Sequence, residues 1–177
     1  MLYNAKLKRI GFLGNLIVGT TATSAFLYGD AVVAHWHHFW PASNWGPAVY
    51  LFLISATLNT SREVSKGIMD VEGDQQYGIK TIAVQRGKPY AAKMVLIIVA
   101  VAFLLTILPV LVGTFGYIFI FAIIAFISLI VNSVVPLVRF PDYEHAKRYK
   151  VNLRPIMFIA LVFVILDVIF QKYTNIY

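Results

Sequence analysis

The sequence predicts an all-α, polytopic membrane protein built as a bundle of five transmembrane helices. Hydrophobic residues make up 59% of its 177 residues, only 13% are charged, and the mean hydropathy is +0.75. A soluble domain carries about 25% charged residues, so lipid rather than water is expected to surround most of this chain. Long uncharged runs also alternate with basic segments, as in membrane spans joined by loops.

The uncharged runs place the five spans in a single membrane domain, residues 1–177, at about 10–29, 45–69, 94–112, 117–138 and 153–171. No residue between Lys93 and Arg139 is charged, and this run is long enough for two spans of about 20 residues each. Gly113 is expected to lie in the turn between them. The three prolines that fall in or beside the later spans are expected to kink or start helices; they are Pro109, Pro136 and Pro155.

The basic residues set the orientation in the cell membrane. All 15 Lys and Arg residues except Lys172 fall on one side of this topology. Loops rich in Lys and Arg stay in the cytoplasm, so we predict a cytoplasmic N-terminus, a cytoplasmic loop after residues 45–69 and a C-terminus outside. The net charge of +7 then indicates attraction to anionic headgroups or phosphates and not nucleic-acid binding.

The span at residues 45–69 runs into a charged segment. Arg62, Lys66 and Asp70 are spaced four residues apart and share one helical face, with Asn59 and Glu63 beside them. Charged groups at this depth are costly unless they line a wet cavity or pair with one another. The charge pattern alone is equally well explained by a solvated helix end in which Glu63 and Lys66 are local ion partners.

Two carboxylates follow directly. Asp70 and Asp74 are one helical turn apart if the helix continues, so both can reach one hard cation. Mg²⁺ typically takes one or two protein carboxylates and completes its shell with water and phosphate oxygens. Arg62 and Lys66 nearby could neutralise the remaining phosphate charge. The pattern therefore favours a magnesium and phosphate site at the inner membrane surface.

Residues 59–87 closely resemble the second aspartate-rich region of the UbiA-type intramembrane prenyltransferases. The shared pattern is DxxxD, a glycine four residues on, and then Lys-Thr-Ile-Ala. Arg-Glu-x-x-Lys upstream and Glu-Gly-Asp inside the motif are most similar to the archaeal lipid branch, the digeranylgeranylglyceryl phosphate synthases. Residues 3–9, Tyr-Asn-Ala-Lys-Leu-Lys-Arg, followed by Gly14-Asn15, resemble the loop before the family's fifth helix. The resemblance thus covers the whole chain and places it in the C-terminal part of a nine-helix fold.

The resemblance implies an enzyme that moves a geranylgeranyl group from its diphosphate to geranylgeranylglyceryl phosphate, in archaeal ether-lipid synthesis. By the same resemblance Asp70 and Asp74 would hold Mg²⁺, and metal and cationic groups would stabilise the leaving diphosphate. Apolar walls would keep water from the allylic cation. The residues expected on the substrate side are Arg62, Lys66, Lys80, Lys8, Tyr3 and Asn15.

This sequence departs from the family pattern in two respects. The family's first motif, NxxxDxxxD, is absent, so the chain is expected to hold half a metal site and to be inactive alone. It would then be a truncated sequence or one piece of a split enzyme, with a separate N-terminal half carrying that motif. Gly67 also stands where many lipid-branch members have Asp, which weakens the assignment of the acceptor. Two alternatives stay open: a related prenyltransferase acting on an aromatic quinone precursor or a chlorin, and a non-catalytic membrane protein retaining half of the fold.

Three polar positions outside the motif need separate interpretation. Asp167 lies well inside the last span, where a carboxylate is a functional candidate by default; alternatively it extends toward Lys172 or bonds to a neighbouring helix. Asn132 is expected to form an interhelical hydrogen bond. Asp142 and Glu144 are expected in a solvated loop.

Overall fold

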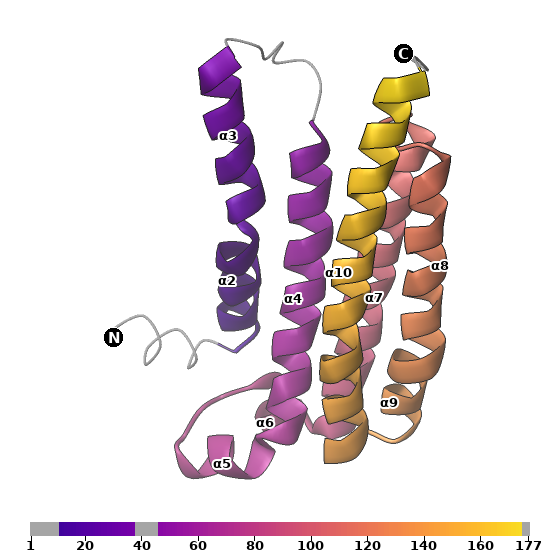
Figure 1. Cartoon of the computed structure of the whole chain (residues 1–177). Coiled ribbons are helices and arrows are strands. Elements are labelled where there is room, and N and C mark those ends of the chain that lie inside the picture. The colour runs from indigo at the N-terminus through magenta and orange to yellow at the C-terminus, as the bar shows by residue number, and fades with distance from the viewer. Residues whose placement is uncertain (1–10, 38–45, 175–177) are drawn as a thin grey trace.

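The computed structural model describes residues 11–37 and 46–174, and over those ranges it is helical without any strand. Most of the helices are long rods lying side by side (Figure 1). The elements are α2 (Phe12–Thr23), α3 (Ala25–His37), α4 (Pro47–Met69), α5 (Val71–Gln76), α6 (Ile82–Arg86), α7 (Lys88–Leu111), η2 (Tyr117–Phe119), α8 (Ile120–Leu129), η3 (Ile130–Val134), α9 (Val135–Arg139) and α10 (Tyr143–Thr174). The predicted all-α bundle is confirmed.

Three continuous helical stretches in the described ranges are long and apolar enough to cross a membrane. They are Lys88–Leu111, Tyr117–Arg139 and Tyr143–Thr174. They correspond to the last three predicted spans, although α10 begins ten residues before the predicted 153. The described residues of the first two predicted spans are helical, but their helices are not both long enough and apolar enough to meet the same condition. The number of five spans therefore stays a prediction.

The first predicted span, at about 10–29, is broken and longer than expected. α2 ends at Thr23, Ser24 caps it, and α3 continues from Ala25 to His37. Hydroxyl side chains cluster at this point and bond back to carbonyls of the preceding turn, for example Thr23 Oγ1 to Gly19 O at 3.0 Å and Ser24 Oγ to Thr21 O at 2.9 Å. Such back-bonding competes with the helix ladder and bends helices.

α4 occupies the centre of the bundle and contacts α2, α7 and α10. Gly46 is extended and precedes Pro47, which suits a first helical turn because it has no N–H to satisfy. The helix ends where predicted, at Met69, and α5 and α6 lie around that end (Figure 1).

The stretch from α8 to α9 contains one wide turn. η3, Ile130–Val134, is a π-helix just before Pro136. Pro136 has no backbone N–H and so cannot donate a hydrogen bond to a carbonyl of the preceding turn. Asn132 in this turn donates to Ser128 O at 2.9 Å, within its own stretch, so the predicted interhelical bond of Asn132 is wrong. The interhelical bond here is Asn152 Nδ2 to Ser133 Oγ, at 2.9 Å.

Asp142 lies in the short connection just before α10, as predicted, and its side chain caps the start of that helix. Its carboxylate accepts from the His145 backbone N–H at 2.9 Å and meets the His145 ring at 2.8 Å. These contacts, the backbone hydrogen bond first, hold the pKa of Asp142 below its ordinary value of 3.8. The prediction of a loop at Glu144 is wrong, because the helix starts at Tyr143, whereas the prediction that Asp142 and Glu144 are solvated is confirmed.

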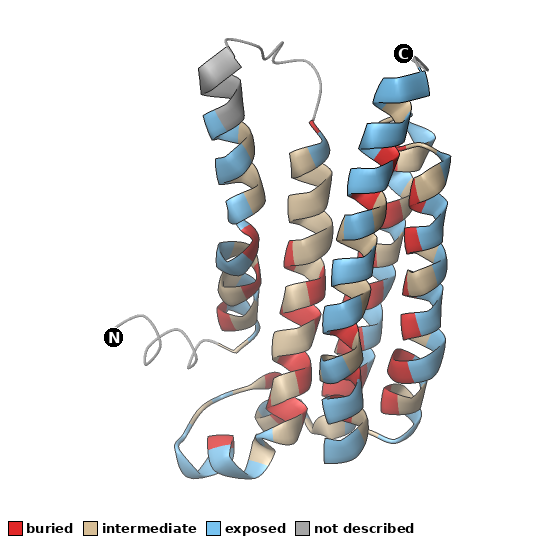
Figure 2. Cartoon of the chain, in the orientation of Figure 1, coloured by how far each residue is buried: buried red, intermediate tan, exposed pale blue. Residues whose placement is uncertain are grey.

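The buried residues lie on the inward faces, most densely around the lower half of α4 and α7 (Figure 2). That cluster includes Ile68, Val95, Leu129 and Leu153, and a smaller one at the other end comprises Phe115, Phe119, Ala122 and Val164. The outward faces are also apolar, as at Leu104 and Ile124, which are 66% and 56% exposed. Apolar faces both inside and outside are expected of helices that lipid surrounds.

Candidate functional site

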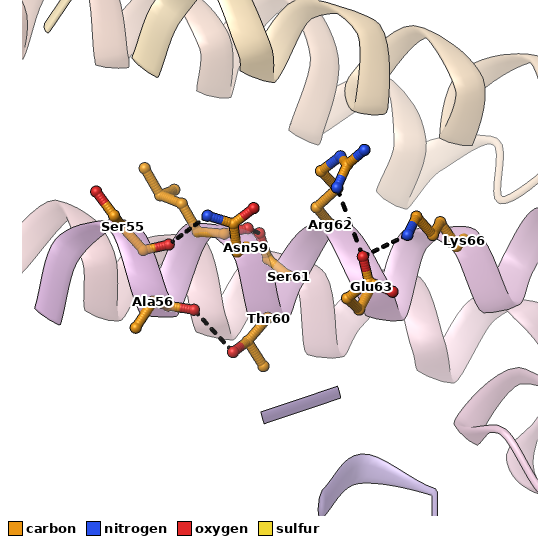
Figure 3. Close-up of polar contacts among 9 residues, drawn as sticks. Ser55, Ala56, Asn59, Thr60, Ser61, Arg62, Glu63 and Lys66 are labelled. Carbon is orange, nitrogen blue, oxygen red and sulfur yellow. Dashed lines mark hydrogen bonds and ion pairs between the residues drawn. The ribbon is translucent and has the colours of Figure 1, made fainter. Parts of the chain in front are cut away.

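One face of α4 joins an apolar cavity to a charged cluster. Ser55, Asn59, Arg62 and Lys66 recur every three or four residues and therefore lie on the same side of the helix. Ser55 and Asn59 line the cavity, whereas Arg62 and Lys66 lie beyond it toward the end of α4 (Figure 3). Along α4, a surface that can contact hydrocarbon is therefore followed by a surface that can bind an anion.

The cavity has a volume of about 300 Å³ and lies between α4, α8, α10, α7 and the α2–α3 pair. None of the described residues that line it is charged. Two of its polar side chains are turned onto their own helices: Asn59 Nδ2 donates to Ser55 O at 3.0 Å and Thr106 Oγ1 to Ala102 O at 2.8 Å. The remaining wall is suited to a branched hydrocarbon. Its largest side chains are Phe26, Phe119, Phe126, Met157 and Phe158.

The charged cluster of α4 consists of Arg62, Glu63 and Lys66. Glu63 Oε1 lies 2.5 Å from Lys66 Nζ and 3.5 Å from an Arg62 terminal nitrogen (Figure 3). The predicted Glu63–Lys66 ion pair is confirmed. The prediction that this helix end is solvated is wrong, because the Arg62 and Glu63 side chains are only 18% and 13% exposed.

Asp70 and Asp74 fall on either side of a bend rather than along one continuing helix. α4 ends at Met69, Asp70 is the junction residue, and α5 starts at Val71. The Asp74 N–H still donates to Asp70 O at 2.8 Å, so the two residues remain one turn apart. Asp70 is exposed and Asp74 is only 8% exposed.

These two carboxylates fit part of a magnesium site. No group of three or more His, Cys, Asp or Glu side chains in the described ranges could hold a metal by itself. Mg²⁺ needs only one or two protein carboxylates when phosphate oxygens and water supply the rest. Asp70 and Asp74 are therefore the residues that could hold it, and they would do so together with an anionic substrate.

The other predicted site residues are less close to this cluster or outside the described part. Lys80 is exposed in the segment between α5 and α6. A Cβ on Gly11 would lie 3.2 Å from Lys80 O, so the start of α2 approaches this segment. Asn15 is half-buried on α2 and is not part of the cavity lining. Tyr3 and Lys8 precede the described residues.

Gly67 faces the start of α6. Gly67 is buried on α4, and a Cβ there would meet Thr81 Cβ at 3.4 Å. Thr81 in turn starts α6, since its hydroxyl accepts from Val84 N–H at 3.3 Å. A Cβ at that distance makes ordinary van der Waals contact, so only the atoms beyond Cβ of a longer side chain would have to find room beside Thr81.

Asp167 is fully buried, and its side chain caps the start of a neighbouring helical stretch. Its carboxylate accepts from the backbone N–H groups of Gly116, Ile118 and Phe119 at 2.6, 3.0 and 3.3 Å, and from Gln171 Nε2 at 2.9 Å. It therefore satisfies the first orphan donors of the η2–α8 stretch. The predicted bond to a neighbouring helix is confirmed, and the alternative extension toward Lys172 is wrong.

Comparison with known proteins decides the family. The model of the UbiA prenyltransferase family matches residues 1–162. The chain belongs to the UbiA prenyltransferase family. Together with the three apolar helices, this makes it an integral membrane protein.

Members of the UbiA family with curated names include several similar archaeal proteins. The chain is 36% identical over 66% of its length to digeranylgeranylglyceryl phosphate synthase of Methanopyrus kandleri, covering 40% of that protein. It is 32% identical over 91% of its length to the same-named protein of Pyrococcus abyssi, covering 53% of it. A solved structure from work on digeranylgeranylglyceryl phosphate synthase in membranes matches with a TM-score of 0.79 and 30% identity, over 94% of this chain and 56% of the other. The chain spans about half the length of the curated relatives that it matches.

The sequence reasoning missed the cavity lining and the double contact of Glu63. The cavity-lining residues Ser55 and Asn59 lie on the same face of α4 as Arg62 and Lys66, at helical spacing. This spacing could have predicted that they belong to the same surface. The aromatic contributions of α8 and α10 could not have been found this way, because they depend on how three helices pack.

Proposed function

We propose that this chain forms one side of the active site of a prenyltransferase that moves a geranylgeranyl group from its diphosphate to geranylgeranylglyceryl phosphate, in archaeal ether-lipid synthesis. The observation that carries the proposal is the α4 face, on which an uncharged cavity is followed by Arg62 and Lys66. A substrate with an isoprenoid tail and a phosphate head matches that order. The names and the similarity of the archaeal relatives support the same substrate class.

In this proposal the donor's hydrocarbon occupies the cavity and its diphosphate lies at the end of α4. Arg62 offers a planar fork of donors to phosphate oxygens, and Lys66 a point charge. Asp70 and Asp74 hold Mg²⁺, which would withdraw charge from the leaving diphosphate when bound. The distribution of Lys and Arg supports a cytoplasmic position for this end of α4, with the C-terminus outside.

The transfer breaks the C1–O bond between the geranylgeranyl group and its diphosphate, which leaves with the electron pair. The acceptor's hydroxyl oxygen then bonds to C1 of the allylic cation and loses its proton. The cavity's contribution is to exclude water, which would otherwise capture the cation and release a free alcohol. Aromatic side chains such as Phe119 and Phe126 also present electron-rich faces that tolerate positive charge.

Two carboxylates and two cationic groups are one side of such a site. We propose that a second carboxylate group of the form NxxxDxxxD completes it from the part of the enzyme that the relatives have beyond the matched region, in the same polypeptide or in a separate chain. The relatives' length, about twice the matched region, supports this arrangement.

The test uses the full-length enzyme in membranes, with geranylgeranyl diphosphate and Mg²⁺. Transfer to geranylgeranylglyceryl phosphate is expected, and Asp70→Ala or Asp74→Ala should lower it by about 100-fold or more, since each removes charge stabilisation from the leaving group. Glu72→Ala is the matched control because this exposed carboxylate lies between the two on α5, and it should retain transfer.

Three results would contradict the proposal. Unchanged transfer in Asp70→Ala or Asp74→Ala would remove the carboxylates from the site. Transfer only to an aromatic quinone precursor or chlorin would identify the sister activity. Failure with every acceptor, in a folded full-length protein, would favour a membrane protein without catalysis.

A further inference from the structure

The two cationic side chains of the charged cluster are not equivalent. Lys66 is held by Glu63 at 2.5 Å, whereas Arg62 reaches the same oxygen only at 3.5 Å, beyond good hydrogen-bond geometry. The Arg62 Nε is buried and has no hydrogen-bond partner among the described residues. Because this Nε is buried, the donors that Arg62 can offer an incoming oxyanion are its terminal nitrogens, while Lys66 is already engaged (Figure 3).

Glu63 is placed unusually for a carboxylate next to a phosphate site. Its side chain is only 13% exposed, and the contacts to Arg62 and Lys66 share one oxygen, Oε1. Pairing with cations offsets the cost of holding a carboxylate so far from bulk water. Any phosphate bound at Arg62 and Lys66 would therefore also meet this fixed negative charge.

We propose that Glu63 is a positioning residue that sets the charge of the phosphate site: it holds Lys66 in place and removes one unit of positive charge from it. The inference rests on the proposed function, in which Arg62 and Lys66 contact phosphate. The three side chains of the cluster carry a formal charge of +1 with Glu63 and +2 without it. Arg62 then takes the first phosphate contact through its free donors, and Lys66 is shared between Glu63 and the ligand.

This arrangement has a consequence for turnover. A diphosphate product carries more charge than the diphosphate ester from which it leaves, so an undiminished pair of cations would retain it. Glu63 competes with the product for Lys66 and weakens its hold. Glu63 therefore lowers the affinity of the site for diphosphate and so favours release of this product.

The alternative is that Glu63 only stabilises the end of α4. The two roles predict opposite changes in anion binding when the charge is removed and the shape is kept. A stabilising ion partner leaves pyrophosphate affinity unchanged or lowers it through disorder. A charge-setting residue raises that affinity.

The experiment measures equilibrium binding of radiolabelled inorganic pyrophosphate, at fixed Mg²⁺, to the purified full-length enzyme in detergent. Glu63→Gln should lower the dissociation constant by about fivefold to tenfold, the effect of one unit charge near the ligand in a partly wet site, and should steepen its salt dependence. Arg62→Gln should raise it by about tenfold, since a charge-assisted fork of donors is lost. Asp30→Asn is the control, because it removes one carboxylate from α3, which lies toward the opposite end of the bundle from the end of α4 (Figure 1), and it should change the constant by less than about twofold.

A double variant separates charge setting from disorder. In Glu63→Gln/Lys66→Gln the whole pair is removed, and the gain seen in Glu63→Gln should be lost because it acts through Lys66. Thermal melting of each variant checks folding independently. If Glu63→Gln binds pyrophosphate no more tightly than the parent, while Arg62→Gln weakens it, the inference about Glu63 is wrong and the phosphate site stands. If the parent binds no pyrophosphate, or Arg62→Gln binds it as tightly as the parent, the phosphate site itself is wrong and the inference fails with it.

Discussion

The contact of Asp167 with the start of the η2–α8 stretch makes a quantitative prediction about stability. Asp167→Ala removes the acceptor of three backbone N–H groups, those of Gly116, Ile118 and Phe119. Leaving a buried donor unsatisfied costs about 1–3 kcal/mol. Water can reach part of this helix end, because Gly116 and Ile118 are only partly buried, so we take about 1 kcal/mol for each and expect a loss of about 3 kcal/mol.

The measurement is thermal unfolding in detergent, followed by circular dichroism. For a chain of this length about 1 kcal/mol lowers the melting temperature by about 2–4 °C, so a decrease of about 6–12 °C is expected. Gln171→Ala is the control, since it removes a single side-chain contact to the same carboxylate at 2.9 Å. It should cost less than about 1.5 kcal/mol.

A decrease of less than about 2 °C in Asp167→Ala, or one no larger than in Gln171→Ala, would refute the reasoning. It would mean that the three N–H groups find other acceptors when the carboxylate is absent. Phe119, whose N–H is one of these donors, also lines the apolar cavity, so a destabilised helix start should also lower prenyl transfer by the full-length enzyme.

Two further predictions concern helix contacts of α4. Gly19→Ala should destabilise the protein by about 1–3 kcal/mol through overpacking, because a Cβ there would lie 2.4 Å from Thr60 Oγ1 and 2.8 Å from Ala56 O; Gly29→Ala, with nothing within 4 Å of its Cβ, should leave the melting temperature unchanged or raise it. An equal effect of the two substitutions would show that α2 does not pack closely on α4. Ser61→Ala should destabilise the protein more than Tyr149→Phe. In Ser61→Ala the buried Tyr149 hydroxyl loses its 2.5 Å contact with Ser61 Oγ, whereas in Tyr149→Phe the Ser61 hydroxyl still donates to Leu58 O at 2.6 Å. The reverse order in thermal unfolding would contradict this assignment.

Much of the helical architecture could be predicted because hydropathy and charge are properties of contiguous sequence. The end of α4 at Met69 agrees with the predicted limit, and the turn at Gly113 follows the expected break, with Gly113 at a φ of 76° that glycine adopts without strain. The break at Ser24 was missed because Thr and Ser in an apolar run do not interrupt hydropathy. The early start of α10 was missed because a charged helix extends beyond the apolar part that defines a span.

The residues of the candidate site could be grouped from the sequence, but not all of the contacts among them could be predicted, and the roles assigned to these residues stay predictions. The i, i+4 spacing identified Arg62, Lys66, Asp70 and Asp74 as neighbours, and the Glu63–Lys66 pair followed from spacing within one turn. Spacing could not show that Arg62 and Glu63 are shielded from solvent, since their surroundings are supplied by other helices. It also could not show that α4 bends at Asp70, which leaves one carboxylate exposed and the other buried.

The sequence by itself determined a helical membrane protein with a charged, aspartate-containing end to its central helix, because apolar runs and i, i+4 spacing are local and need no knowledge of packing. Only the tertiary structure decided which polar groups are buried and what they face. Asp167 became a helix cap because Gly116, distant in sequence, is packed against it. The apolar cavity exists only where side chains of α4, α8 and α10 converge without filling the space between them.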